Sequence, residues 1–367
     1  MYKNKSNPMR ILLNGATAGT NFGDFLFAKM FQQKVADLVG EDNVFWYNSR
    51  YALSDFFARH LKYSRKYRLG DINGLIYISG GYFHGDDHTL KDYIIRYLRY
   101  FHIGIRCILR KIPMAICAVE VGSTNSRFIY LVEKLILKKS KIIIVRNDES
   151  YNYAISMGAQ NVICTADSVF ALSKSMFDDY SVPSLIKSDR SKLLFLHVNR
   201  SVDENKQILE KIVPIVNEFC LNHPEYNVVV GMDQYTSNQK DIFDYLANFI
   251  TAPTIFNEYN DPFQLCKTID MCDLIVTHKL HVGIVGAHLG KSIISFSGHT
   301  SKIERLYKQL NIPSRTVPLK KLSKELGVQM LERYHDEPVE VPKEVRDAAK
   351  SNFSHLECFI KQLSGNY

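Results

Sequence analysis

The chain has little of what would place it in a special class of protein. Its 367 residues include a single Trp, 19 Gly and 11 Pro, while 46% are hydrophobic and 23% are charged. The low glycine and proline content excludes a collagen-like chain, and the apolar fraction is too high for a largely disordered one. A soluble globular protein is therefore expected, and the length favours two domains.

Clustered cysteines and long apolar runs are also missing. The seven cysteines are scattered without a Cys-x-x-Cys pair, so neither a disulfide scaffold nor a structural zinc site is expected. Apolar neighbours around Cys117 and Cys164 predict buried free thiols, as in a reducing cytoplasm. No apolar run reaches the roughly 18 residues of a transmembrane helix. The apolar run within residues 10–14 is too short for the core of a signal peptide. A cytoplasmic protein is expected.

The net charge is modest. Lys and Arg number 46 against 38 Asp and Glu, a difference of +8. Such an excess suits an anionic substrate, an acidic membrane surface or a nucleic acid, and it does not choose among them. Nucleic acid is the least expected partner, because the cations do not form a recognisable binding motif.

Short apolar runs alternate with helix-length segments, which indicates parallel sheets covered on both faces. The expected strands are 11–14, 44–47, 75–79, 114–119, 141–145, 162–164, 193–197, 227–231, 254–256, 274–276 and 292–296. We expect two doubly wound Rossmann-like α/β domains facing a cleft, with ligands at the carboxyl ends of the strands. The expected domains are residues 1–180 and 190–340, joined by a polar linker near 173–192 and followed by a C-terminal helix, 341–367.

Two glycine-containing turns follow expected strands. Asn21, Gly23 and Asp24 open the first helix, where backbone amides could face an anion or a sugar, or where Asp24 could simply cap the helix. Gly80 and Gly81 follow the third strand and would let a substrate approach the backbone closely. His84, Asp86, Asp87 and His88 come next; such a cluster is more often a set of substrate contacts or caps than a metal site.

Cationic side chains follow three later strands. Arg146 ends an apolar strand, where it could clamp a carboxylate or phosphate, or pair with Asp148 or Glu149. The segment Thr277-His278-Lys279-Leu280-His281 leads into a helix of small residues. Cations gain nothing from the positive end of a helix dipole, so this placement favours a functional role. Lys302, after the following strand, adds one more cation or marks a solvated helix start.

The segment 92–110 has helical periodicity. It predicts an apolar face and an opposite face carrying Arg96, Arg99, Arg106 and Arg110. A basic face of this kind could contact an anionic membrane or hold a pyrophosphate, or it could be an ordinary solvated surface.

In combination these motifs resemble the polysaccharide pyruvyl transferase family. The resembling pieces are Asn21-x-Gly23-Asp24, Ser79-Gly80-Gly81, residues 145–150 around Arg146, Ala166-Asp167-Ser168, Thr277-x-Lys279-Leu280-His281 and Lys302. Together they extend over most of residues 10–310. The resemblance implies a fold like that of the two-domain GT-B glycosyltransferases. It also implies transfer of pyruvate from phosphoenolpyruvate onto two sugar hydroxyls as a cyclic ketal, without a cofactor or metal.

The resemblance further implies that Arg146, Lys279, His281 and Lys302 contact phosphoenolpyruvate. The family usually has Arg where this chain has Lys279, and a lysine keeps the charge but loses the bidentate fork. His281 is the expected general acid and base. The acceptor is expected against the N-terminal domain near Asn21, Asp24, Gly80, Gly81 and His84, with Tyr82 and Phe83 as possible stacking partners of a sugar ring. A lipid-linked acceptor would agree with the basic helix face.

Two other functions fit the same residues. A GT-B glycosyltransferase would use the cationic cleft for a nucleotide-sugar diphosphate, with Glu258 or Asp261 as a candidate for binding the ribose. A non-catalytic saccharide-binding protein is disfavoured, because it has no use for Arg146, His281 and Lys302 together.

Overall fold

The computed structural model describes residues 8–48, 53–61, 66–85, 89–182, 192–298 and 300–365. The chain divides into two compact units: the first comprises Met1–Thr20, Asp24–Ala171 and Arg346–Tyr367, and the second Asn21–Gly23 and Leu172–Val345. The boundary falls at the start of the expected linker. The described part of that linker contains a short 3-10 helix, Lys174–Met176, while 183–191 lie outside the described residues.

The first unit is built on a parallel sheet. Its strands are β1 (Ile11–Asn14), β2 (Val44–Trp46), β3 (Gly74–Tyr77), β4 (Gly80–Gly85), β5 (Met114–Thr124), β6 (Ile142–Val145) and β7 (Val162–Cys164). The order is β2-β1-β3-β5-β6-β7, with β4 pairing the far end of β5. The order reverses between β1 and β3, the kind of switch point where open α/β sheets bind ligands.

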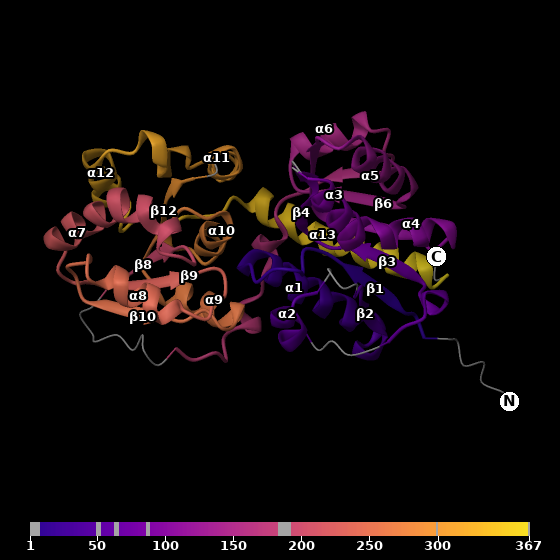
Figure 1. Cartoon of the computed structure of the whole chain (residues 1–367), viewed down its shortest axis with the longest axis horizontal. Helices are drawn as coiled ribbons and strands as arrows, with labels where there is room; N and C mark the ends of the chain where they lie inside the picture. The colour runs from indigo at the N-terminus through magenta and orange to yellow at the C-terminus, as the bar shows by residue number, and fades with distance from the viewer. Residues whose placement is uncertain are drawn as a thin grey trace. The chain divides into compact units, whose positions relative to one another are not determined.

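Helices cover this sheet because its strands are apolar and nearly fully buried. They are α1 (Phe22–Val39), α2 (Asp55–His60), α3 (Leu90–Arg96), a π turn (Tyr97–Phe101), α4 (His102–Leu109), α5 (Arg127–Lys139) and α6 (Asp148–Ser156). The C-terminal helix α13 (Lys343–Leu363), yellow in Figure 1, returns to this unit. Its Asn352 is fully buried and accepts a 2.7 Å hydrogen bond from Thr165.

The second unit is a six-stranded parallel sheet. Its strands are β8 (Lys192–Val198), β9 (Tyr226–Met232), β10 (Thr254–Asn257), β11 (Leu274–Thr277), β12 (Ser292–Ser297) and β13 (Thr316–Pro318), in the order β10-β9-β8-β11-β12-β13. Its helices are α7 (Val213–Asn222), preceded by a π turn (Ile208–Ile212), α8 (Gln239–Ala247), α9 (Pro262–Met271), α10 (Leu280–His288), α11 (Thr300–Gln309) and α12 (Lys324–Tyr334). The switch point lies between β8 and β11.

Each of the eleven strands expected from the sequence is confirmed, to within a few residues at the ends. Two strands, β4 and β13, were not expected. Considered from the sequence alone, the glycines at both ends of β4 favour a loop. The segment forms a strand because it pairs with β5.

The helical segment 92–110 differs from its expected periodicity. The π turn interrupts it, and its extra residue rotates the following side chains relative to a continuous α-helix. Ile94 and Leu109, which a continuous α-helix over this segment would place on its apolar face, are exposed, whereas Arg96 is buried. The expected basic face is therefore wrong at Arg96. Within the described ranges, no helix is both long and apolar enough to cross a membrane.

Candidate active site

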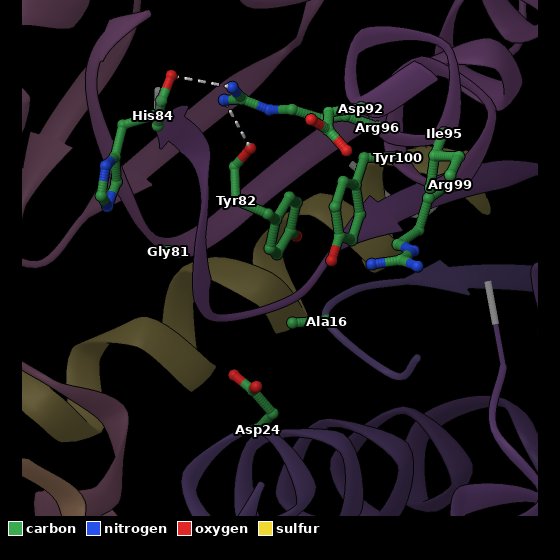
Figure 2. A pocket seen from close by; sticks show the side chains of 11 residues that line it. Ala16, Asp24, Gly81, Tyr82, His84, Asp92, Ile95, Arg96, Arg99 and Tyr100 are labelled. Atoms are coloured by element: carbon green, nitrogen blue, oxygen red, sulfur yellow. Dashed lines mark hydrogen bonds between the residues drawn. The ribbon is translucent and has the colours of Figure 1, made fainter. Parts of the chain in front are cut away.

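A pocket of about 710 Å³ opens in the first unit beside the β1–β3 switch point. It is lined by residues that follow β1, by β4 and by α3 with its π turn: Ala16, Asp24, Gly81, Tyr82, His84, Gly85, Asp92, Ile95, Arg96, Arg99 and Tyr100. Figure 2 shows the rings of Tyr82 and Tyr100 face to face, with the Asp24 carboxylate reaching in from α1. The two rings stack with centroids 4.7 Å apart.

Arg96 fixes one wall of this pocket. Its guanidinium donates to the backbone oxygens of Gly85 and Tyr82 at 3.1 and 3.2 Å, and it forms a 3.0 Å ion pair with Glu133. Figure 2 shows this side chain extended along β4. A buried guanidinium needs such partners because an unpaired charge is costly inside a protein. Arg96 therefore holds β4 against α3 and α5.

Beside the pocket lies a buried ionic cluster around Arg146. One guanidinium nitrogen lies 2.5 Å from Oε2 of Glu120, and another lies 3.0 Å from Oδ2 of Asp167. His84, which lines the pocket, lies 3.8 Å from the same Glu120 oxygen. These partners replace the pairing with Asp148 or Glu149 that the sequence left open. Burial would lower the pKa of Arg146, but Asp167 and Glu120 outweigh it and the pKa is raised. The guanidinium is thus charged and held in one orientation.

A local irregularity in β5 positions Glu120. The pairing of β5 with β6 shifts register between Ile116 and Val119, and Ala118 has a left-handed φ of 56°. Ser79 donates a 2.8 Å hydrogen bond to the Ala118 carbonyl. An extra residue in a strand reverses the alternation of side chains beyond it, and such bulges are common next to active sites. Non-glycine residues in left-handed backbone store strain of this kind at functional sites.

The second unit carries a row of close polar contacts at its switch point, where β8 and β11 end. Nε2 of His197 lies 3.1 Å from a carboxylate oxygen of Asp233, Nδ1 of His197 lies 3.3 Å from Nδ1 of His278, and Nε2 of His278 lies 2.9 Å from Oδ1 of Asn199. His197 is fully buried, and Asp233 and His278 are nearly so. Burial alone would raise the pKa of Asp233, but His197, Lys279 and His278 lower it to about 2.

Asn199 donates its amide hydrogen to the Glu204 carbonyl, which leaves its Oδ1 to accept from Nε2 of His278. The imidazole of His278 is thus held between His197 and Asn199.

The candidate donor residues are distributed over both units. Lys279 precedes α10, His281 lies in its first turn, and Lys302 lies in the first turn of α11; all three are half-buried. Nδ1 of His281 lies directly over the Cα of Gly23, where a β-carbon would be 2.1 Å away. Arg146 belongs to the first unit and the other three residues to the second.

The candidate acceptor residues have different surroundings. Asp24, Gly81 and His84 line the pocket, whereas Gly80 is buried at the start of β4 with a φ of 154°. Asn21 belongs to the second unit, where it forms an isolated bridge with Gln234 and its side chain accepts from the amide of Gly23. Phe83 is fully buried against Tyr77 and Phe101, so its expected contact with a sugar ring is wrong. Asp86, Asp87 and His88 lie outside the described residues.

Sequence reasoning missed Glu120, His197 and Asp233. Each is a lone polar residue within or directly after an apolar strand, which is the signal that could have identified them. Among the described residues, no group of three or more His, Cys, Asp or Glu side chains is arranged to hold a metal ion.

Comparisons with known proteins identify a family for the chain and similar structures for its fold. A family model described as polysaccharide pyruvyl transferase matches residues 21–300. No curated protein matches the chain by sequence. A putative UDP-N-acetylglucosamine 2-epimerase from Listeria monocytogenes is similar in structure with a TM-score of 0.63 at 11% identity, covering 97% of each chain. The UDP-GlcNAc 2-epimerase of Neisseria meningitidis, bound to UDP-GlcNAc, has a TM-score of 0.57 at 12% identity, over 95% of this chain and 99% of that one.

A third similar structure is Anabaena Alr3699/HepE in complex with UDP-glucose, with a TM-score of 0.51 at 13% identity, over 98% of this chain and 100% of that one. At such low identity these likenesses show the fold alone. The fold is that of the GT-B-type enzymes, as the family resemblance implied.

Proposed function

Since the chain belongs to the polysaccharide pyruvyl transferase family, we propose that it transfers pyruvate from phosphoenolpyruvate onto two hydroxyls of a sugar, forming a cyclic ketal. The family match over residues 21–300 carries this proposal. The sugar belongs to a polysaccharide or to a lipid-linked oligosaccharide precursor. Family membership makes the protein a transferase; the donor and the ketal product are the proposed part.

The reaction makes definite demands on side chains. The enol double bond takes a proton at the methylene carbon, C2 gains bonds to two sugar oxygens, and the bond between C2 and the phosphate oxygen breaks. Of the two hydroxyl protons released, one matches the proton that the methylene gains and the other leaves with the phosphate. The enzyme therefore needs an acid for carbon, a base for the hydroxyls and cations for a donor that carries a carboxylate and a phosphate.

The second unit offers the acid and the cations. We assign His281 to proton transfer, and Lys279 and Lys302 to the anionic groups of the donor, because all three lie at amino ends of helices after parallel strands. His278, which directly precedes Lys279, is held in place by its contacts with the buried His197 and with Asn199.

The first unit offers a site for a sugar. The stacked Tyr82 and Tyr100 rings form an aromatic wall, while Asp24, His84 and Arg99 supply polar groups that suit hydroxyls. Arg146 keeps N–H donors beyond the two that bind Glu120 and Asp167, so its fixed guanidinium can also hold a donor carboxylate or phosphate.

The decisive test is phosphate release. Purified protein is incubated with phosphoenolpyruvate and a panel of free and lipid-linked oligosaccharides, and the product is examined by NMR for the new methyl group of the ketal. In His281→Ala the rate of phosphate release is expected to fall by about a hundredfold or more, the typical effect of losing a general acid or base. His355→Ala, a half-buried histidine on α13, is the control and should keep full activity. In the same assay Tyr100→Ala should raise the acceptor KM and leave the donor KM unchanged.

Ligand-induced thermal stabilisation separates the competing functions. Phosphoenolpyruvate should raise Tm, and a UDP-sugar should not. Stabilisation by the UDP-sugar alone would indicate a glycosyltransferase, and full activity of His281→Ala would disprove the assignment of His281.

A further inference from the structure

The positive charge of this protein is concentrated in one stretch of chain. Residues 93–147 contain eleven Lys and Arg but only two acidic residues, Glu120 and Glu133, a net charge of 11 − 2 = +9. The whole chain carries +8, so all the other residues together carry −1. The basicity of the protein is therefore a property of one segment, which runs from the middle of α3 to just past β6 in the first unit.

The two acidic residues of this segment do not offset that charge at the surface. Glu133 is fully buried and pairs with Arg96, and Glu120 is buried and pairs with Arg146. These two pairs remove two cations and two anions from the count. Nine cations of the segment remain, and within it no acidic side chain is exposed to balance them.

Helix α5 adds an exposed apolar stripe to this basic surface. Phe128, Leu131 and Leu135 are 54%, 55% and 40% exposed, and at about 100° per residue they lie within roughly 60° of one another. The exposed cations Arg127, Lys138 and Lys139 lie on the same side of the helix. Its opposite side packs into the core through Ile129, Ile136 and Leu137. The outward face of α5 thus combines apolar and positive side chains without a negative one.

Neighbouring elements extend the surface. The ring of Phe128 lies 5.4 Å from that of Tyr97 in the π turn, and α4 packs beside α5. At the end of α4, Leu109 is 78% exposed, and it is followed by the exposed Arg110 and Lys111. We call this set the α4–α5 surface: Leu109, Arg110, Lys111, Arg127, Phe128, Leu131, Leu135, Lys138 and Lys139.

We propose that the α4–α5 surface binds an anionic phospholipid bilayer, with Phe128 and Leu131 inserted among the headgroups. Apolar side chains beside lysines and arginines match a lipid surface, which presents negative headgroups above a hydrocarbon layer. A docking protein would have to supply acidic groups against the five cations of this surface, and a second copy of this chain would bring the same positive charge. The repulsion between two such surfaces disfavours self-association.

This binding is independent of the proposed reaction, because none of the nine residues lines the pocket or belongs to the candidate donor set. Variants in this surface should therefore leave phosphate release from phosphoenolpyruvate with a free oligosaccharide acceptor unchanged. The proposed ligand of the α4–α5 surface is the phospholipid bilayer itself.

The test is co-sedimentation of the full chain with vesicles. Vesicles of phosphatidylcholine are compared with vesicles that also contain phosphatidylglycerol, at low salt and at about 0.5 M salt, where charge interactions are strongly screened. We expect binding to the anionic vesicles only, weakened at high salt. Lys138→Glu/Lys139→Glu should weaken binding about thirtyfold or more, since each cation near an anionic surface contributes severalfold. Phe128→Ser/Leu131→Ser should weaken it about tenfold at either salt concentration.

Matched controls lie in the second unit. Lys320→Glu/Lys321→Glu reverses an adjacent exposed lysine pair, and Leu221→Ser removes a leucine that is 79% exposed on α7. Both should bind vesicles as the wild type does.

Equal loss of binding in variants and controls, or equal binding to neutral and anionic vesicles, would overturn the proposal. It would also be overturned if Phe128→Ser/Leu131→Ser dissolved a dimer, or if a duplex oligonucleotide bound through the same lysines while vesicles did not.

Discussion

Gly23 and His281 are in direct contact: a β-carbon at Gly23 would lie 2.1 Å from Nδ1 of the imidazole and 2.3 Å from its Cγ. The two residues belong to motifs more than 250 positions apart in the sequence. Gly23 stands in the turn that opens α1, and His281 in the first turn of α10. The missing side chain at Gly23 is what allows the imidazole to occupy its position.

Gly23→Ala should therefore act on His281 and not on the fold. The new methyl group would push the imidazole aside by about 1 Å or more, and a displacement of that size can reduce a rate about a hundredfold. We expect kcat for phosphate release to fall by that order, with a Tm close to that of the wild type. Gly298→Ala is the control, because the nearest atom to its β-carbon would be 4.0 Å away. Unchanged kcat in Gly23→Ala would show that His281 is not the proton-transfer group.

Asp233 predicts a specific dependence of stability on pH. Burial acts to raise its pKa, but the neighbouring His197, Lys279 and His278 lower it from 3.8 to about 2. Because the pKa is lower in the folded state, the carboxylate stabilises the fold fully above about pH 4, and this contribution disappears as the pH falls through about 2. The shift corresponds to about 2 kcal/mol.

Urea unfolding of the wild type and Asp233→Asn between pH 5 and pH 2 measures this contribution. The difference in the free energy of unfolding should be about 2 kcal/mol at pH 5 and should shrink toward pH 2. Asp203→Asn, which removes a carboxylate that is 87% exposed, should show a small difference that does not change over this range. A constant difference for Asp233→Asn would contradict the ion pair with His197.

Much of the fold could be predicted because its signals are local. Both end residues of the strand Ile11–Asn14 were predicted correctly, since a short apolar run that ends in a glycine turn is typical of a buried parallel strand. Asp24, Gly81 and His84 were expected to share a site, and they line one pocket, because carboxyl ends of parallel strands meet at one edge of a sheet.

What could not be predicted depends on contacts between distant segments. Ile116 and Glu120 are four residues apart in β5, so simple alternation puts both side chains on one face of the sheet. The register shift at Ala118 breaks that alternation, and only the neighbouring strand reveals it. Likewise, Arg96 was expected at the surface because its burial requires Glu133, which lies 37 residues further along the chain.

Two substitutions of Arg146 can separate its effect on stability from its effect on donor binding. Arg146→Met would leave Glu120 and Asp167 buried without their common cation, and breaking a buried ion pair in this way costs about 3–5 kcal/mol. Arg146→Lys keeps the charge, but an ammonium group cannot bind both carboxylates and the donor as a planar fork does. We therefore expect Arg146→Lys to remain folded and to have a raised KM for phosphoenolpyruvate, measured by phosphate release at saturating acceptor. Lys174→Met removes an exposed ion pair with Asp270 and should change stability by less than about 1 kcal/mol. If Arg146→Lys kept the wild-type KM while its kcat fell, Arg146 would act only by positioning Glu120 and Asp167, and the donor carboxylate would have to be held by Lys279 and Lys302 alone.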